Sequence, residues 1–259
     1  MKRTNFLLLI TAVVMAIYVI ACRKPSGIEN ITVAENEPYV PFPWYEPDKS
    51  ANPYDYMGQE HNEALKVVDD YLQKTADSSV DGRQKAIAGY FKRKYGKDVL
   101  PSLVEAYQQL KDYRKTNFEG FVKELKVREP VRKYLYQISE LTSKVDSYEG
   151  QERYQSEMKE LETWIMADKN LSEEDSRILL VTTATAKYSA AFWTEKIRFT
   201  EQNDTGKVSF LHRLIRLHAY ITTDMFAATW ALVTFSEDIN AVAADESGQM
   251  AWYVDAFVP

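Results

Sequence analysis

His61 is the residue of this 259-residue chain that looks best placed for acid–base or metal chemistry. It stands beside Glu60, Asn62 and Glu63, and a neighbouring carboxylate could orient the imidazole as a base or a ligand. The structural interpretation is a buried histidine that completes the apolar stripe of its helix. We therefore keep His61 as a candidate functional residue beside this structural alternative.

Asp224 is the second candidate, because it is the only charged residue in the run 219–235. An unpaired carboxylate in apolar surroundings is costly, so a buried aspartate usually has a partner. A structural ion pair with Arg213, Arg216 or Lys187 is the expected account. A perturbed acid in a catalytic cleft is the alternative.

The usual patterns of catalytic and metal-binding residues are absent from the sequence. There is no nucleophile elbow, phosphate-binding glycine loop, dinucleotide fingerprint or HExxH motif, and no histidine follows a glutamate at the spacing of helical di-iron sites. His212 and His218 are six residues apart, on roughly opposite faces of a helix. We expect no metal, no cofactor and no catalytic residue that the sequence can name.

Cys22 is the only cysteine, and it ends a segment with the layout of an export signal. Lys2 and Arg3 precede an apolar run over residues 6–20, which is short for a membrane span. Small Ala21 comes directly before the cysteine. The chain therefore has no internal disulfide, and residues 1–21 are predicted to be a signal peptide.

The sequence Val19-Ile20-Ala21-Cys22 resembles the lipobox of bacterial lipoproteins. The resemblance implies cleavage before Cys22, a diacylglycerol on its sulfur and a fatty acid such as palmitate on its new amino group. Several acyl chains hold a protein on a membrane stably where one does so only marginally. We expect the membrane to be the first partner of this chain.

The residues after the cysteine bear on which membrane carries it. Arg23 and Lys24 stand where an aspartate would signal inner-membrane retention, and no acidic cluster that resembles a surface-export signal follows. We expect the outer membrane, with the domain facing the periplasm. Nucleic acid is not an expected partner, because the net charge is −6 and no nucleic-acid-binding motif appears.

Residues 22–54 are predicted to be an extended tether. Six prolines interrupt any helical period. Phe42, Trp44 and Tyr45 are too apolar for a purely solvated linker, so this segment should pack on something. It either straps across its own domain or contacts a partner protein or glycan, which makes Trp44 and Tyr45 candidate functional residues.

Residues 55–259 are predicted to form an all-α, multi-helix bundle of about seven to nine helices, because apolar residues recur at helical spacing and glycine is scarce. The spacing predicts a first helix over residues 57–75, a second capped by Asp81 and ended by Gly96, and a hairpin that turns near residues 149–150. Ser172 and Asp175 resemble a capping box at the start of a long helix.

Two stretches of this bundle are unusually poor in charge. Residues 181–192 are mostly small or aromatic with Lys187 as the single charge, so this helix should be central. The run 219–235 is short for a membrane span and contains four threonines and Asp224, which argues against insertion in a bilayer. A last, weaker helix is expected within residues 237–257.

The sequence Asn52-Pro53-Tyr54-Asp55-Tyr56-Met57-Gly58-Gln59-Glu60-His61-Asn62 resembles the start of the mature domain in uncharacterised lipoproteins of Bacteroidota. The resemblance implies a source and a compartment, but no activity. Physically, Pro53 keeps Asn52 extended, and Asp55 or Gly58 can cap the first helix. We interpret these eleven residues, called the NPYD motif below, as the junction between tether and bundle.

Three functions remain open at this point. The favoured one is a non-enzymatic, membrane-anchored module that contacts another envelope component. The alternatives are a hydrolase that acts on envelope or dietary glycans through carboxylates from distant helices, and a protein that binds a peptide or lipid between its helices.

Overall fold

The computed structural model describes residues 47, 50–75, 77, 79–113, 118–145, 148–203, 210–234 and 241–245. All of them belong to one unit, Phe42–Pro259. The fold is all-α, as predicted, and the described residues contain no strand. Cys22, Trp44 and Tyr45 lie outside the described residues, as does the predicted signal peptide.

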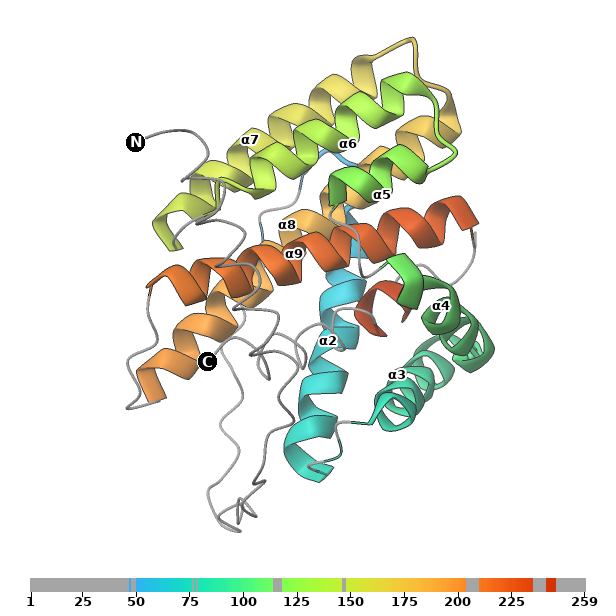
Figure 1. Cartoon of the computed structure of the whole chain (residues 1–259), viewed down its shortest axis with the longest axis vertical. Helices are drawn as coiled ribbons and strands as arrows, with labels where there is room; N and C mark the ends of the chain where they lie inside the picture. Colours follow the sequence, from blue (N-terminus) through green and yellow to red (C-terminus); the bar gives the residue numbers. More distant parts are fainter. Residues whose placement is uncertain are drawn as a thin grey trace, which may run out of the picture. The chain divides into compact units, whose positions relative to one another are not determined.

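Eight longer helices and one short helical segment at residues 241–245 are described (Figure 1). In chain order the longer ones are α2 (Asp55–Thr75), α3 (Val80–Tyr95), α4 (Leu100–Tyr113), α5 (Phe118–Glu124), α6 (Glu129–Thr142), α7 (Tyr148–Ala167), α8 (Glu173–Asn203) and α9 (Phe210–Thr234).

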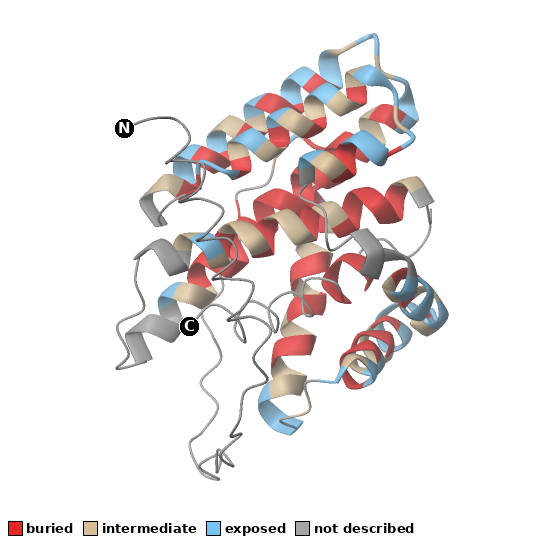
Figure 2. Ribbon diagram, viewed as in Figure 1, coloured by how far each residue is buried: buried red, intermediate tan, exposed pale blue. Residues whose placement is uncertain are grey.

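Helix α8 is the centre of the bundle. It packs against α2, α6, α7 and α9, and α9 lies along it (Figure 1). Every residue from 178 to 195 is buried, so the middle of α8 is covered on all sides (Figure 2). A soluble helix can be buried all round only inside a core, and small side chains let several neighbours approach it. The prediction that residues 181–192 are central is confirmed.

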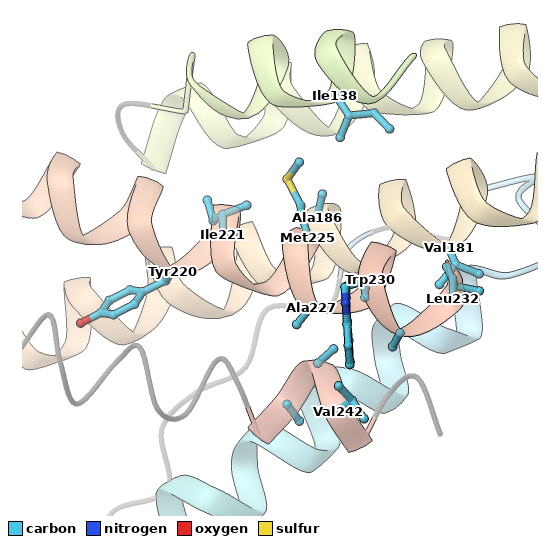
Figure 3. Close-up of a cluster of buried hydrophobic side chains, with 14 of the residues drawn as sticks. Ile138, Val181, Ala186, Tyr220, Ile221, Met225, Ala227, Trp230, Leu232 and Val242 are labelled. Carbon is cyan, nitrogen blue, oxygen red and sulfur yellow. The ribbon is translucent and has the colours of Figure 1, made fainter. Parts of the chain in front are cut away.

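Among the described helices, α8 and α9 make the most extensive contact, and buried hydrophobic side chains fill part of it (Figure 3). Ile221 and Met225 of α9 are completely buried, and Ile138 of α6 covers the same cluster. Inside it the hydroxyls of Thr182 and Thr229 are 2.9 Å apart, which satisfies two polar groups within apolar surroundings. The second charge-poor stretch is therefore core. No described helix has the length and apolar character needed to span a membrane.

The capping residues of two helices test the predicted boundaries. Ser79, and not Asp81, caps α3, because its side chain accepts a hydrogen bond from the Gly82 amide at 3.0 Å. Gly96 ends the helix with a left-handed φ of 69°, as predicted. The capping box at α8 is also confirmed: Ser172 Oγ accepts from the Asp175 amide at 3.1 Å, and the Asp175 carboxylate accepts from the Ser172 amide at 2.9 Å.

Two predicted boundaries were wrong. Helix α2 begins at Asp55 rather than residue 57, because Asn52 Oδ1 accepts from the Tyr54 amide at 2.8 Å and turns the chain into the helix early. The hairpin turn lies between Thr142 and Tyr148, so Glu149 and Gly150 are inside α7. A run of polar residues inside a helix resembles a turn when only composition is considered.

At Gly58 the backbone of α2 lies close against α8. A Cβ atom at this position would lie 2.5 Å from the Ala184 carbonyl oxygen and 2.5 Å from the Tyr188 ring. Backbone oxygen cannot move aside without shifting the helix that carries it. Glycine at 58 is therefore required by the approach of the two helices and does not act as a helix cap.

We predict that Gly58→Ala lowers the free energy of unfolding by about 1–3 kcal/mol, because the added methyl group overpacks a rigid contact. Gly89→Ala in α3 is the matched control, since its Cβ would meet only the flexible end of Arg93, at 3.3 Å. That variant should gain about 0.5–1 kcal/mol from helix propensity. Urea unfolding followed by circular dichroism measures both, and equal effects of the two variants would contradict the assigned contact.

Candidate functional site

The NPYD motif forms the face that α2 and its preceding turn present to α8. Asn52, Asp55, Gly58 and Asn62 recur at steps of three to four residues, which places them along one side of a helix. All four are buried, together with His61. Tyr56 points away and is 60% exposed. The motif is thus a packing surface, and its polar members must find partners inside the protein.

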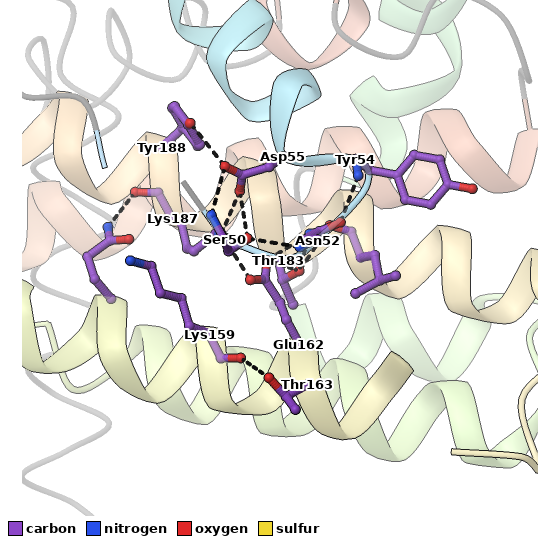
Figure 4. Close-up of polar contacts among 12 residues, drawn as sticks. Ser50, Asn52, Tyr54, Asp55, Lys159, Glu162, Thr163, Thr183, Lys187 and Tyr188 are labelled. Atoms are coloured by element: carbon purple, nitrogen blue, oxygen red, sulfur yellow. Dashed lines mark hydrogen bonds and ion pairs between the residues drawn. The ribbon is translucent and has the colours of Figure 1, made fainter. Parts of the chain in front are cut away.

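Lys187 of α8 supplies the first of these partners (Figure 4). Its side chain has no exposed surface, and its ammonium donates to Asp55 Oδ1 at 2.6 Å and to Glu162 Oε2 of α7 at 3.0 Å. The third bond goes to Ser50 Oγ at 2.9 Å. All three protons of the ammonium are therefore used, which is the arrangement that makes a buried cation tolerable.

The two carboxylates around Lys187 have further donors of their own. Asp55 also accepts from Tyr188 Oη at 3.2 Å. Glu162 Oε1 accepts from Asn52 Nδ2 at 2.7 Å and from Thr183 Oγ1 at 2.9 Å. Buried polar networks stabilise and orient a core when every member is satisfied. We call these residues, with Ser50 and Lys187, the Lys187 network.

The Lys187 network fastens the entry of the chain to the centre of the bundle. Asp55 and Lys187 are 132 positions apart in sequence, and Asn52 and Glu162 are 110 apart. Ser50 and Asn52 fall in the range that the sequence assigned to the tether, yet both bind core residues. The chain entering the bundle is therefore attached directly to α7 and α8 and not through α2 alone.

The structure brings the two sequence candidates, His61 and Asp224, together. His61 Nε2 lies 3.7 Å from Asp224 Oδ2, and neither side chain has exposed surface. Asp224 Oδ2 accepts from Ser189 Oγ at 2.5 Å and from Trp193 Nε1 at 3.0 Å, both on α8. Lys187, one of the three cations considered for Asp224, pairs instead with Asp55 and Glu162. The side chain of Arg213 is outside the described residues.

Serine, histidine and aspartate meet at this point, but their order does not fit nucleophilic catalysis. In a hydrolytic triad the histidine lies between the serine and the carboxylate, so that it can take the serine proton. Here Ser189 donates directly to Asp224, and His61 approaches the same carboxylate oxygen. Each of the three side chains is completely buried, so a substrate cannot reach the hydroxyl in this conformation.

The environment of His61 favours its neutral form. Burial lowers its pKa below the usual 6.5, and this outweighs the opposing effects of the Asp224 charge and the Asn62 hydrogen bond. Asn62 Nδ2 donates to the Tyr188 carbonyl at 2.8 Å, which leaves Asn62 Oδ1 to accept from His61 Nδ1 at 3.2 Å. The proton is then on Nδ1, and His61 links α2 to Asp224 of α9 inside the core.

Sequence reasoning missed the partners that define both clusters. Glu162 and Ser189 carried no signal, because each is an ordinary polar residue in its own helix. Lys187 did carry one: it is the single charge in a stretch of small and aromatic residues, so it had to be paired. Asn52 and Asp55 were visible only as members of the NPYD motif, whose physical meaning is now a shared contact with α7 and α8.

The described residues contain no group of three or more histidine, cysteine, aspartate or glutamate side chains placed to hold a metal ion. The two clusters hold α2, α7, α8 and α9 in one arrangement through buried hydrogen bonds.

Replacing Lys187 with methionine should lower the free energy of unfolding by about 3–5 kcal/mol, because two buried carboxylates lose their shared cation. Lys85→Met is the control: its pair with Asp81 is 2.6 Å long but more than half exposed on both sides. That loss should be within about 0.5 kcal/mol. Guanidinium titration of both variants is the measurement, and a Lys187→Met loss as small as the control would show that the network is not needed.

A second prediction concerns pH. Because the pKa of His61 is lowered in the folded protein, below pH 6.5 the unfolded chain binds a proton that the folded chain does not. Stability contributed at this position should therefore fall as pH drops below that value, by up to about 1.4 kcal/mol per pH unit. Above it, no pH dependence arises from His61.

His61→Gln removes the titrating group, so the stability difference between wild type and variant should shrink as the pH is lowered from 7.5 to 5.5. Unfolding titrations at a series of pH values measure this difference. A constant gap between the two curves would contradict the assignment.

A scan against protein-family models and searches of curated proteins and of solved structures found no match to this chain.

Proposed function

We propose that this chain is a lipid-anchored binding module of the bacterial cell envelope, in which an exported helical bundle is held at a membrane by acylated Cys22. The observation that carries the proposal is the position of the only cysteine. It directly follows a small residue at the end of a short apolar run, and two basic residues precede that run. A cysteine with no disulfide partner in an exported chain is well explained by lipidation.

The way the chain enters the bundle supports this proposal. A tethered domain needs a secure attachment between its linker and its core. The Lys187 network supplies one, since Ser50, Asn52 and Asp55 bind side chains of α7 and α8 directly. The resemblance of the NPYD motif to the start of mature Bacteroidota lipoproteins agrees with a junction at this place.

A binding role is favoured over catalysis by the burial of the candidate chemical groups. His61, Ser189 and Asp224 have no exposed surface and are arranged in an order unsuited to nucleophilic attack. Carboxylate-based glycan hydrolysis and the binding of a peptide or lipid between helices are the alternatives. We place the module at the outer membrane facing the periplasm, because Arg23 and Lys24 follow the cysteine in place of a retention or surface-export signal.

The anchor is tested by Cys22→Ala in the full chain, expressed in a Gram-negative host with labelled palmitate. We expect label in the wild type and none in the variant, together with loss of the mature-sized protein from the membrane fraction. Lys24→Ala is the control and should keep its label. Labelling of Cys22→Ala at the wild-type level would refute the anchor.

A further inference from the structure

A surface groove of about 680 Å³ lies between α6, the end of α7 and the loop that leads to α8. Its volume is in the range of small-ligand sites. The groove is separate from both buried clusters and shares no residue with them. The side chains that matter here are Arg128, Lys133, Tyr134, Gln137, Trp164 and Asp168.

Trp164 supplies an unusual apolar surface to this groove. The residue is 54% exposed, although the next residue of α7, Ile165, is completely buried in the core. Tyr134 of α6 lines the same groove, so two aromatic side chains border one space. A single exposed apolar residue needs no explanation, but an exposed indole beside convergent polar groups is typical of a ligand site.

The polar wall of the groove is already fixed in position. Tyr134 Oη donates to Asp168 Oδ2 at 3.1 Å, and the Asn170 amide and side chain both donate to Asp168 Oδ1 at 2.9 Å. These hydrogen bonds lower the pKa of Asp168, the backbone bond from Asn170 most of all. Asp168 is therefore an oriented, ionised acceptor, and binding would not have to order it.

The two basic residues of the groove differ in whether the protein already binds them. Arg128 is occupied, since it donates to Asp175 Oδ2 at 2.6 Å and to the Asn170 carbonyl at 2.8 Å. Lys133 is exposed, and no described residue forms an ion pair or hydrogen bond with its ammonium. The groove thus offers a cation that is available to a ligand, beside an aromatic face and an acceptor.

We propose that this groove binds a saccharide that carries a carboxylate group. The apolar face of a sugar ring would stack on Trp164, its hydroxyls would donate to Asp168 and exchange hydrogen bonds with Gln137, and its carboxylate would pair with Lys133. The inference deepens the proposed binding function by naming the class of partner. It also rests on that function for its setting, since the cell envelope is where such polymers occur.

The chemistry of the lining favours a saccharide over a lipid. A lipid tail needs an enclosed apolar cavity, whereas this groove is bordered by charged and amide side chains. Gln137 both donates and accepts, as sugar hydroxyls do. The lining holds one carboxylate, Asp168, and glycan hydrolysis generally uses a pair, so the groove fits binding without cleavage.

The test is isothermal calorimetry on the full-length protein in detergent, titrated with oligogalacturonate, with hyaluronan oligosaccharides and with neutral glucose oligosaccharides. We expect an acidic oligosaccharide to bind more tightly than the neutral one. Trp164→Ala should weaken that binding about tenfold or more, because the stacking surface is lost. Lys133→Gln should weaken acidic binding and bring it to the level of the neutral oligosaccharide.

Met166→Ala is the matched control, because Met166 is 40% exposed on the same helix but does not line the groove. Its affinity should equal that of the wild type. Failure of both acidic oligosaccharides to bind, equal binding of acidic and neutral ones, or unchanged binding by Trp164→Ala would overturn the inference. None of these results depends on lipidation of Cys22, so the anchor and the groove can fail separately.

Discussion

The buried ammonium of Lys187 is the contact on which the arrangement of α2, α7 and α8 depends. Two carboxylates from helices far apart in sequence meet at one cation, and each has further hydrogen bonds. Such a group is costly to bury unless every polar atom is satisfied, so alternative packings that separate its members are strongly disfavoured. The network therefore specifies which face of α2 contacts α8. It also fixes the residues before α2, since Ser50 and Asn52 belong to it.

The rest of the core follows from this choice. Gly58 lets α2 approach the backbone of α8 one turn after Asp55, and His61 and Asn62 continue the contact toward Asp224 and Tyr188. On its other sides α8 packs against α6, α7 and α9. A central helix with large side chains could not accept so many neighbours at helix-packing distance. The NPYD motif and the small residues of α8 are thus two halves of one interface.

The helices of this architecture are largely predictable from the sequence. The partners of its buried polar side chains are not. Hydrophobic periodicity gives the helices, and the lack of charge in residues 181–192 gives the central one. His61, Asp224 and Lys187 each stand out as polar residues in apolar surroundings. Their partners do not, because Glu162 and Ser189 come from other helices and nothing local marks them. The turn after Thr142 is predicted in the wrong place, because the polar residues at 149–150 lie inside α7 and do not end a helix.

In the function proposed for this chain, the buried residues hold the fold and the outer surface recognises a partner. The contacts of the NPYD motif with α7 and α8 put the motif in the most stable part of the bundle. Native-state amide hydrogen exchange tests this directly. We predict that amides of residues 58–65 exchange only through global unfolding, with the same free energy as those of residues 181–192. Rapid exchange of residues 58–65 while α8 stays protected would show that the motif is not part of the core.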